Sequence, residues 1–131
     1  MPMAWLFLDT HAVGEFRLGW LRENGTADVK RYAGKAHRLL PRLSRITHHA
    51  TRDILGICVV AGPGSFSSVR SGVLDANLLA RLWRVPLVGV TVEDAQDLPA
   101  LARRLAAEHS RGAAYVAPIY DAEPNITVRV C

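Results

Sequence analysis

An apolar run that ends in a tight turn and opens a long helix constrains the fold of this chain most. The run ILGICVVA is followed directly by the turn residues Gly62, Pro63, Gly64 and Ser65. Glycine adopts backbone angles that other residues avoid and proline fixes its own φ, so this sequence predicts a sharp turn. Ser65 can then cap the helix that the pattern predicts over residues 65–84. A buried strand that turns sharply into a capped helix is a common site of phosphate or partner binding.

Length and composition indicate one globular unit. The chain has 131 residues, of which 50% are hydrophobic and 21% charged, as in folded rather than disordered proteins. The net charge of +4, with arginine far more frequent than lysine, permits contact with RNA or another acidic partner but does not establish one. The N-terminus has no secretory pattern, and no apolar stretch reaches the ~18 to 20 residues of a membrane span. We therefore expect a single cytoplasmic domain over residues 1–131.

Hydrophobic periodicity divides the chain into three opening strands followed by alternating helices and strands. Three antiparallel strands are predicted over residues 4–8, 15–22 and 27–32, the last two joined by a hairpin turn at Asn24-Gly25. Helices are predicted over residues 36–47, 65–84 and 93–109, with Pro41 disturbing the first. Buried strands are predicted over residues 53–60 and 87–92, and a terminal hairpin over residues 113–120 and 125–130. This order predicts an α/β fold with a mixed sheet, packed helices and a C-terminal hairpin.

Asp9 and Thr10 follow the first predicted strand, where actin-like folds and sugar kinases place a phosphate-handling aspartate. They are a weak candidate nucleotide site, because an aspartate at a strand end is usually a turn former. The turn at residues 62–65 lacks the lysine that a P-loop needs for its phosphates. Ser65 lies in no nucleophile elbow and is explained by helix capping. We therefore predict no catalytic residue.

No metal site or cofactor is predicted either. The histidines are not at spacings that place two on one helix face, as zinc sites require: they are His11, His37, His48, His49 and His109. Cys58 lies inside the apolar run and is predicted to be a small buried hydrophobic residue rather than a nucleophile.

The segment GPGSFSSVRSG, followed about fifteen residues later by VPLVGVTVED, resembles the TsaB (YeaZ) family. In that family a Gly-Pro-Gly-Ser-Phe turn leads into a helix and then into a Gly-Val strand. The segments LDTHAVGEFRLGW and HRLLPRL are similar to the family's opening hairpin and to its proline-containing first helix. The resemblance implies an actin-like (ASKHA, ribonuclease H-like) lobe with a mixed five-stranded sheet. Residues 112–131 resemble the start of a second lobe, which is either lost naturally, the alternative we favour, or missing from a fragment.

The resemblance also implies a role in making threonylcarbamoyladenosine in the anticodon loop of tRNA. In this family TsaB is not the catalyst but pairs with its paralogue TsaD, which holds the metal and transfers the threonylcarbamoyl group. A TsaE ATPase joins them, TsaB-like proteins pair with themselves when TsaD is absent, and tRNA is contacted through the complex. Pairing uses the two helices represented here by residues 36–47 and 65–84. The implied partner-binding residues are Leu39, Leu43, Ile46, Arg70, Leu74, Asn77, Leu78 and Arg81.

The helix after the turn departs from the family pattern, which has small and apolar residues there. This chain instead carries Ser71, Leu74, Asp75 and Leu78. Leucine in place of glycine widens helix packing, so we expect a partner surface remodelled for an altered TsaD or for self-pairing. Two other functions stay open. One is an actin-like nucleotide-binding ATPase that uses Asp9 and the turn; the other is a homodimeric remnant or regulator whose arginines contact tRNA, namely Arg38, Arg42, Arg45, Arg81 and Arg84.

Overall fold

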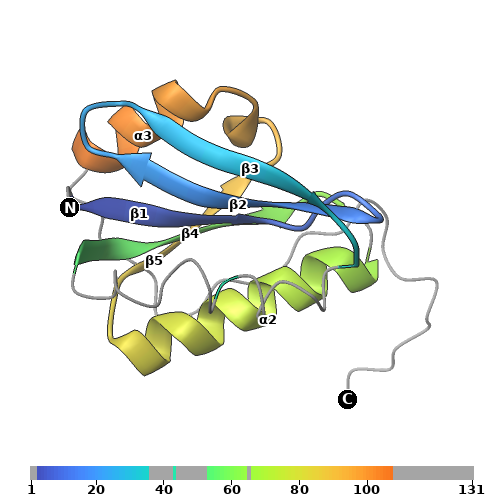
Figure 1. Ribbon diagram of the computed structural model, residues 1–131. Coiled ribbons are helices and arrows are strands. Elements are labelled where there is room, and N and C mark those ends of the chain that lie inside the picture. The colour runs from blue at the N-terminus through green and yellow to red at the C-terminus, as the bar shows by residue number, and fades with distance from the viewer. Residues whose placement is uncertain (1–2, 36–42, 44–52, 65, 108–131) are drawn as a thin grey trace, which may run out of the picture.

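A five-stranded sheet forms the middle layer of the described part of the protein, with helix α2 on one face and helix α3 on the other (Figure 1). The computed structural model describes residues 3–35, 43, 53–64 and 66–107. The strands are β1 (Ala4–Asp9), β2 (Glu15–Arg22), β3 (Ala27–Ala33), β4 (Ile54–Gly62) and β5 (Leu87–Thr91). The helices are α2 (Phe66–Trp83), a 3-10 turn η3 (Asp94–Gln96) and α3 (Leu98–Ala107).

The sheet is mixed, with the strand order β3-β2-β1-β4-β5. β1 pairs antiparallel with β2 and parallel with β4, β2 and β3 form an antiparallel hairpin, and β5 lies parallel to β4. Every residue of β1 is buried, because the strand has a neighbour on each side and helices above and below. The predicted mixed five-stranded sheet is confirmed, including the three antiparallel strands at its start.

Alternate side chains of the central strands enter two separate cores. Leu6, Leu8 and Val59 point towards α2 and pack there with Val69 and Val73. The intervening side chains point towards α3, in a core formed by Trp5, Phe7, Leu21, Cys58, Val60, Val90, Ala95, Leu101, Ala102 and Leu105. A strand covered on both faces needs apolar residues at every position, which explains the continuous apolar runs of β1 and β4.

The predicted strand–turn–helix is confirmed, and it links β4 to α2. Gly62 ends β4 with a φ of 123°, a conformation that favours glycine, and the Gly62–Pro63 peptide bond is cis. The Gly62 carbonyl accepts a hydrogen bond from the amide of Val92, 3.0 Å away, which joins the turn to the end of β5. α2 then runs to Trp83 and ends at Arg84, whose φ of 55° is left-handed. The capping role predicted for Ser65 lies outside the described residues.

The single helix predicted over residues 93–109 is wrong at its start. The chain first makes the η3 turn. Its start is held by two hydrogen bonds of 3.1 Å: the amide of Thr91 donates to the carboxylate of Asp94, and the amide of Asp94 donates to the hydroxyl of Thr91. Asp97 then caps α3, because its Oδ1 accepts a hydrogen bond from the amide of Ala100 at 3.2 Å. Pro99 is tolerated in the first turn, where its missing N–H has no helical partner.

Three other expectations concern parts of the chain with little or no description. Of the helix predicted over residues 36–47, the structure describes Leu43, which is helical and buried in the core beneath α2. The terminal hairpin and the second-lobe resemblance of residues 112–131 lie outside the described residues. None of the described helices is long and apolar enough to cross a membrane.

We predict that Cys58 is inert in the native protein. Its side chain is fully buried, as the sequence predicted, and burial raises the pKa of the thiol from 9.0 to about 12. The reactive thiolate is therefore almost absent at pH 8. In a Cys131→Ser variant, a thiol reagent such as Ellman's should react with Cys58 only after unfolding in guanidinium. Complete labelling of the native variant within minutes would contradict the burial.

Candidate functional site

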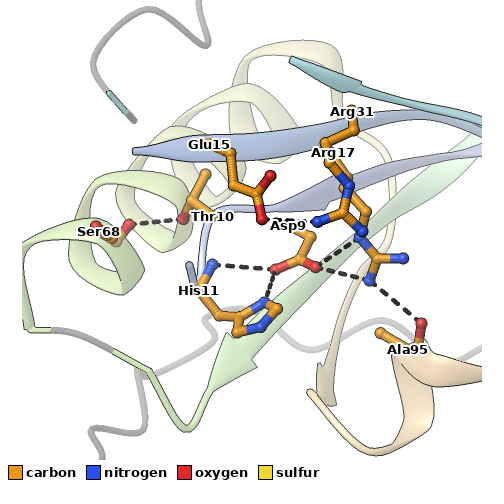
Figure 2. A network of polar contacts seen from close by, with 8 residues as sticks. All are labelled: Asp9, Thr10, His11, Glu15, Arg17, Arg31, Ser68 and Ala95. Atoms are coloured by element: carbon orange, nitrogen blue, oxygen red, sulfur yellow. Dashed lines mark hydrogen bonds and ion pairs between the residues drawn. The ribbon is translucent and has the colours of Figure 1, made fainter. Parts of the chain in front are cut away.

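A network of polar contacts surrounds Asp9 at the end of β1 (Figure 2). Asp9 and Thr10 are the buried polar side chains among the described residues, with exposures of 2% and 1%. Oδ1 of Asp9 accepts a hydrogen bond from the amide of His11 at 3.0 Å and lies 2.6 Å from its Nδ1. Oδ2 accepts hydrogen bonds from Nε and Nη2 of Arg17, at 2.9 and 2.7 Å. Arg17 also donates to the carbonyl of Ala95 at 3.2 Å, so the network joins β1, β2 and η3.

These contacts engage both oxygens of the Asp9 carboxylate. A carboxylate has roughly four lone-pair sites, and four donor contacts surround this one. The guanidinium of Arg17 is also held over the ring of Phe7, 5.3 Å from its centroid. A metal ion or phosphate-bound water at Asp9 would have to displace His11 or Arg17. The geometry therefore favours a structural role of Asp9 over the weak nucleotide site considered from the sequence.

Thr10 fixes the start of α2 against the end of β1. Its hydroxyl donates a hydrogen bond of 2.6 Å to the carbonyl of Ser68, in the first turn of the helix. Gly72, one turn further on, lies so close that a Cβ added there would collide with the Thr10 hydroxyl. Gly64 is similarly confined, since a Cβ there would lie 2.8 Å from the carbonyl oxygen of His11. The turn and the helix are thus packed onto the strand end as a close joint.

The opposite side of α2 carries an exposed apolar stripe, the α2 leucine face, formed by Leu74, Leu78 and Leu82. Their exposures are 51%, 60% and 69%, and their spacing of four residues aligns them along the helix. Contiguous exposed apolar side chains often mark an interaction site. Two arginines, Arg70 and Arg81, are exposed on the same helix.

The structure brings together only part of the predicted partner surface. Leu74, Leu78, Arg70 and Arg81 are all exposed on α2, as expected. Asn77 is half-buried, and its amide nitrogen donates to the carbonyl of Val73 at 2.8 Å. Leu43 packs in the core, so it supports the fold and does not belong to an exposed surface. Leu39 and Ile46 lie outside the described residues.

One residue of this face was missing from the sequence prediction, and a second residue, Asp75, was named there only as a departure from the family pattern. Leu82 continues the stripe, and its spacing of four residues from Leu78 was a signal that could have identified it. Asp75 lies beside Leu78 and is half-buried. Burial raises the pKa of the Asp75 carboxyl from 3.8 to about 6. The carboxylate makes no hydrogen bond or ion pair within the part of the chain that the structure describes.

No group of three or more His, Cys, Asp or Glu side chains gathers to hold a metal ion among residues 3–35, 43, 53–64 and 66–107. The polar cluster at Asp9 is instead balanced by arginine, and it offers a metal ion no open carboxylate edge.

Comparison with known proteins identifies the family. Residues 31–122 match the family model described as TsaD, tRNA N6-adenosine threonylcarbamoyltransferase. The chain belongs to this family. The matched segment includes β4, the turn at residues 62–64 and all of α2, which are the elements that carry the joint and the leucine face.

The resemblance to TsaB (YeaZ) proteins is also confirmed. YeaZ from Pseudomonas aeruginosa is similar to 67% of this chain, with a TM-score of 0.56 and 28% sequence identity. A second solved structure, an uncharacterized protein with similarity to peptidase YEAZ from Pseudomonas aeruginosa, covers 68% with a TM-score of 0.57 and 27% identity. Together with the mixed sheet, these structures confirm the predicted actin-like α/β lobe.

The chain spans less than half the length of these relatives, 44% and 43% of the two solved chains. It is also 46% identical over 41 residues to a tRNA N6-adenosine threonylcarbamoyltransferase of Candida albicans, a match that covers 31% of this chain and 11% of that protein.

We predict that Arg17→Gln destabilises the fold by about 3 kcal/mol, because it leaves the buried Asp9 carboxylate without its cation. The matched control is Arg31→Gln in the neighbouring strand, whose ion pair with Glu15 is exposed and contributes less than about 1 kcal/mol. Urea unfolding followed by tryptophan fluorescence measures both. Equal losses would show that the Asp9 network does not hold β1, β2 and η3 together.

Asp75→Asn should stabilise the isolated protein at neutral pH. A carboxyl whose pKa is raised in the folded state adds stability when protonated, and this is lost as pH rises from about 4 through about 6. The asparagine variant has no such loss, so its advantage in melting temperature should grow between pH 4 and 6 and level off above. If the difference in melting temperature between variant and wild type did not change with pH over this range, Asp75 would not have a raised pKa in the folded protein.

Proposed function

We propose that the chain is a non-catalytic partner subunit in the synthesis of threonylcarbamoyladenosine on tRNA, and that it pairs with a TsaD-family chain through α2. The observation that carries this proposal is the α2 leucine face, an exposed apolar stripe on the helix that follows the family's turn. Leucines left in water on one side of a packed helix are stabilised when a second surface covers them.

Burial of this face supplies a useful but limited driving force. Full burial of a leucine side chain contributes about 1.5–3 kcal/mol, and these three are already partly covered, so each would add about 1 kcal/mol. Association also costs several kcal/mol of translational and rotational freedom. Stable pairing therefore needs further contacts, and the exposed Arg70 and Arg81 of α2 lie where they could provide them.

The contacts of Asp9 support a subunit without its own catalytic centre. In the alternative function, an actin-like ATPase, Asp9 would face a nucleotide-bound metal. In this structure the carboxylate of Asp9 is bonded to Arg17 and His11, and the turn after β4 is packed against the end of β1. Recruitment of a TsaE-like ATPase, self-pairing in the absence of a partner, and contact with tRNA only through the complex belong to the same proposal.

We predict that Leu78→Arg weakens pairing at least tenfold without unfolding the domain. The substitution places a charge at the centre of the apolar stripe, whereas the side chain contributes little to the core because it is 60% exposed. The matched control is Val13→Arg, an exposed apolar position outside α2. Affinity for a TsaD-family protein of the same organism can be measured by isothermal titration calorimetry, with melting temperature as the test of folding.

Three outcomes would count against this function. If the wild-type chain forms no complex with the TsaD-family protein at micromolar concentration, the proposed partner role is wrong. An unchanged affinity for Leu78→Arg would mean that α2 is not the pairing surface. Saturable binding of ATP and magnesium that is lost in Asp9→Asn would instead favour the nucleotide-binding alternative.

A further inference from the structure

Asp75 lies at the edge of the α2 leucine face. Residues three and four apart are neighbours on a helix surface, so its side chain stands beside Leu78 and Leu79, with Leu82 one turn further along. The carboxylate is half-buried although no described residue bonds to it. A polar group in such a position has lost part of its water without gaining a partner.

No charged group among the described residues compensates Asp75. Arg70 and Arg81 are five and six residues away along α2, spacings that place them on other sides of the helix. Beneath α2 lie β1, β4 and β5, whose titratable side chains are Asp9 and Cys58. Asp9 is bonded to Arg17, and Cys58 packs in the core beneath α3. No cation from the described chain therefore faces the Asp75 carboxylate.

We propose that the partner which covers the α2 leucine face carries an arginine or lysine that pairs with Asp75, and that this pair selects the partner. The inference rests on the proposed function, because it concerns the surface used for pairing. A partner that covers Leu78 and Leu82 also removes water from the adjacent carboxylate. Burial of an unpaired charge opposes binding, so an apolar partner is disfavoured and one with a matching cation is favoured.

The leucines alone would not discriminate between partners. Apolar burial is non-directional, and many helices could cover a stripe of this size. A carboxylate next to the stripe adds a requirement for charge at one position, which excludes partners that lack it. Arginine meets this requirement best, since its guanidinium can donate two parallel hydrogen bonds to a carboxylate.

The test compares wild type, Asp75→Asn, Asp75→Leu and Leu78→Arg in their affinity for the TsaD-family protein of the same organism. Each is measured by calorimetry at pH 7.5 and 5.5, and at 50 and 300 mM NaCl. We expect Asp75→Asn to weaken pairing about tenfold at pH 7.5, because a hydrogen bond between charged groups is replaced by a weaker one. We also expect wild-type affinity to fall at pH 5.5 and at high salt, whereas the Asp75→Asn affinity changes less.

The pH comparison separates the ion pair from a protonated Asp75 that enters an apolar interface. In that second arrangement wild type binds more tightly at pH 5.5, and Asp75→Leu binds as tightly as wild type or more so. Either result would overturn the proposed cation. If the wild type binds, Leu78→Arg does not, and Asp75→Asn is unchanged, the pairing surface stands and only the role of Asp75 fails. If the wild type does not bind at all, the proposed function fails with it.

Discussion

The close joint between the end of β1 and the start of α2 determines how the rest of the molecule is arranged. Thr10 holds the carbonyl of Ser68, while Gly64 and Gly72 leave no room for a side chain between helix and strand. Because the helix cannot tilt away at this end, its buried side is fixed against β4 and its leucines are fixed outward. The joint at the start of α2, together with the core contacts of Val69, Val73 and Ala76, therefore leaves the proposed partner surface on the outer side of the helix.

Much of this arrangement could be predicted from the sequence, because its signals are local. The apolar runs predicted β1 and β4, the Asn24-Gly25 turn predicted the β2–β3 hairpin, and the turn at residues 62–64 predicted the helix after it. The division between η3 and α3 was missed, although Asp97 and Pro99 are both residues that begin helices. The helical spacing of apolar residues over 93–109 suggested one continuous helix, and the capping residues within this segment were not given enough weight.

The candidate site was less predictable, because its contacts join residues that are distant in the sequence. That Arg17 neutralises Asp9 depends on the register of β1 against β2, which places the two residues opposite each other. That Leu43 is buried depends on which side of its helix faces the sheet. The burial of Asp75 likewise depends on how α2 sits on the sheet, and a helical period alone does not report it.

The two aspartates show how one fold can treat a carboxylate in opposite ways. Asp9 is almost completely buried, yet the guanidinium of Arg17 and the donors of His11 compensate its charge, so it stabilises the structure. Asp75 is less buried, but no described residue compensates it, so its charge opposes the folded state at neutral pH. A protein gains nothing in stability by keeping an acid at such a position on an otherwise apolar face. In the proposed pairing, a cation of the partner would compensate this charge, so Asp75 would set a requirement for the partner that the leucines alone do not set.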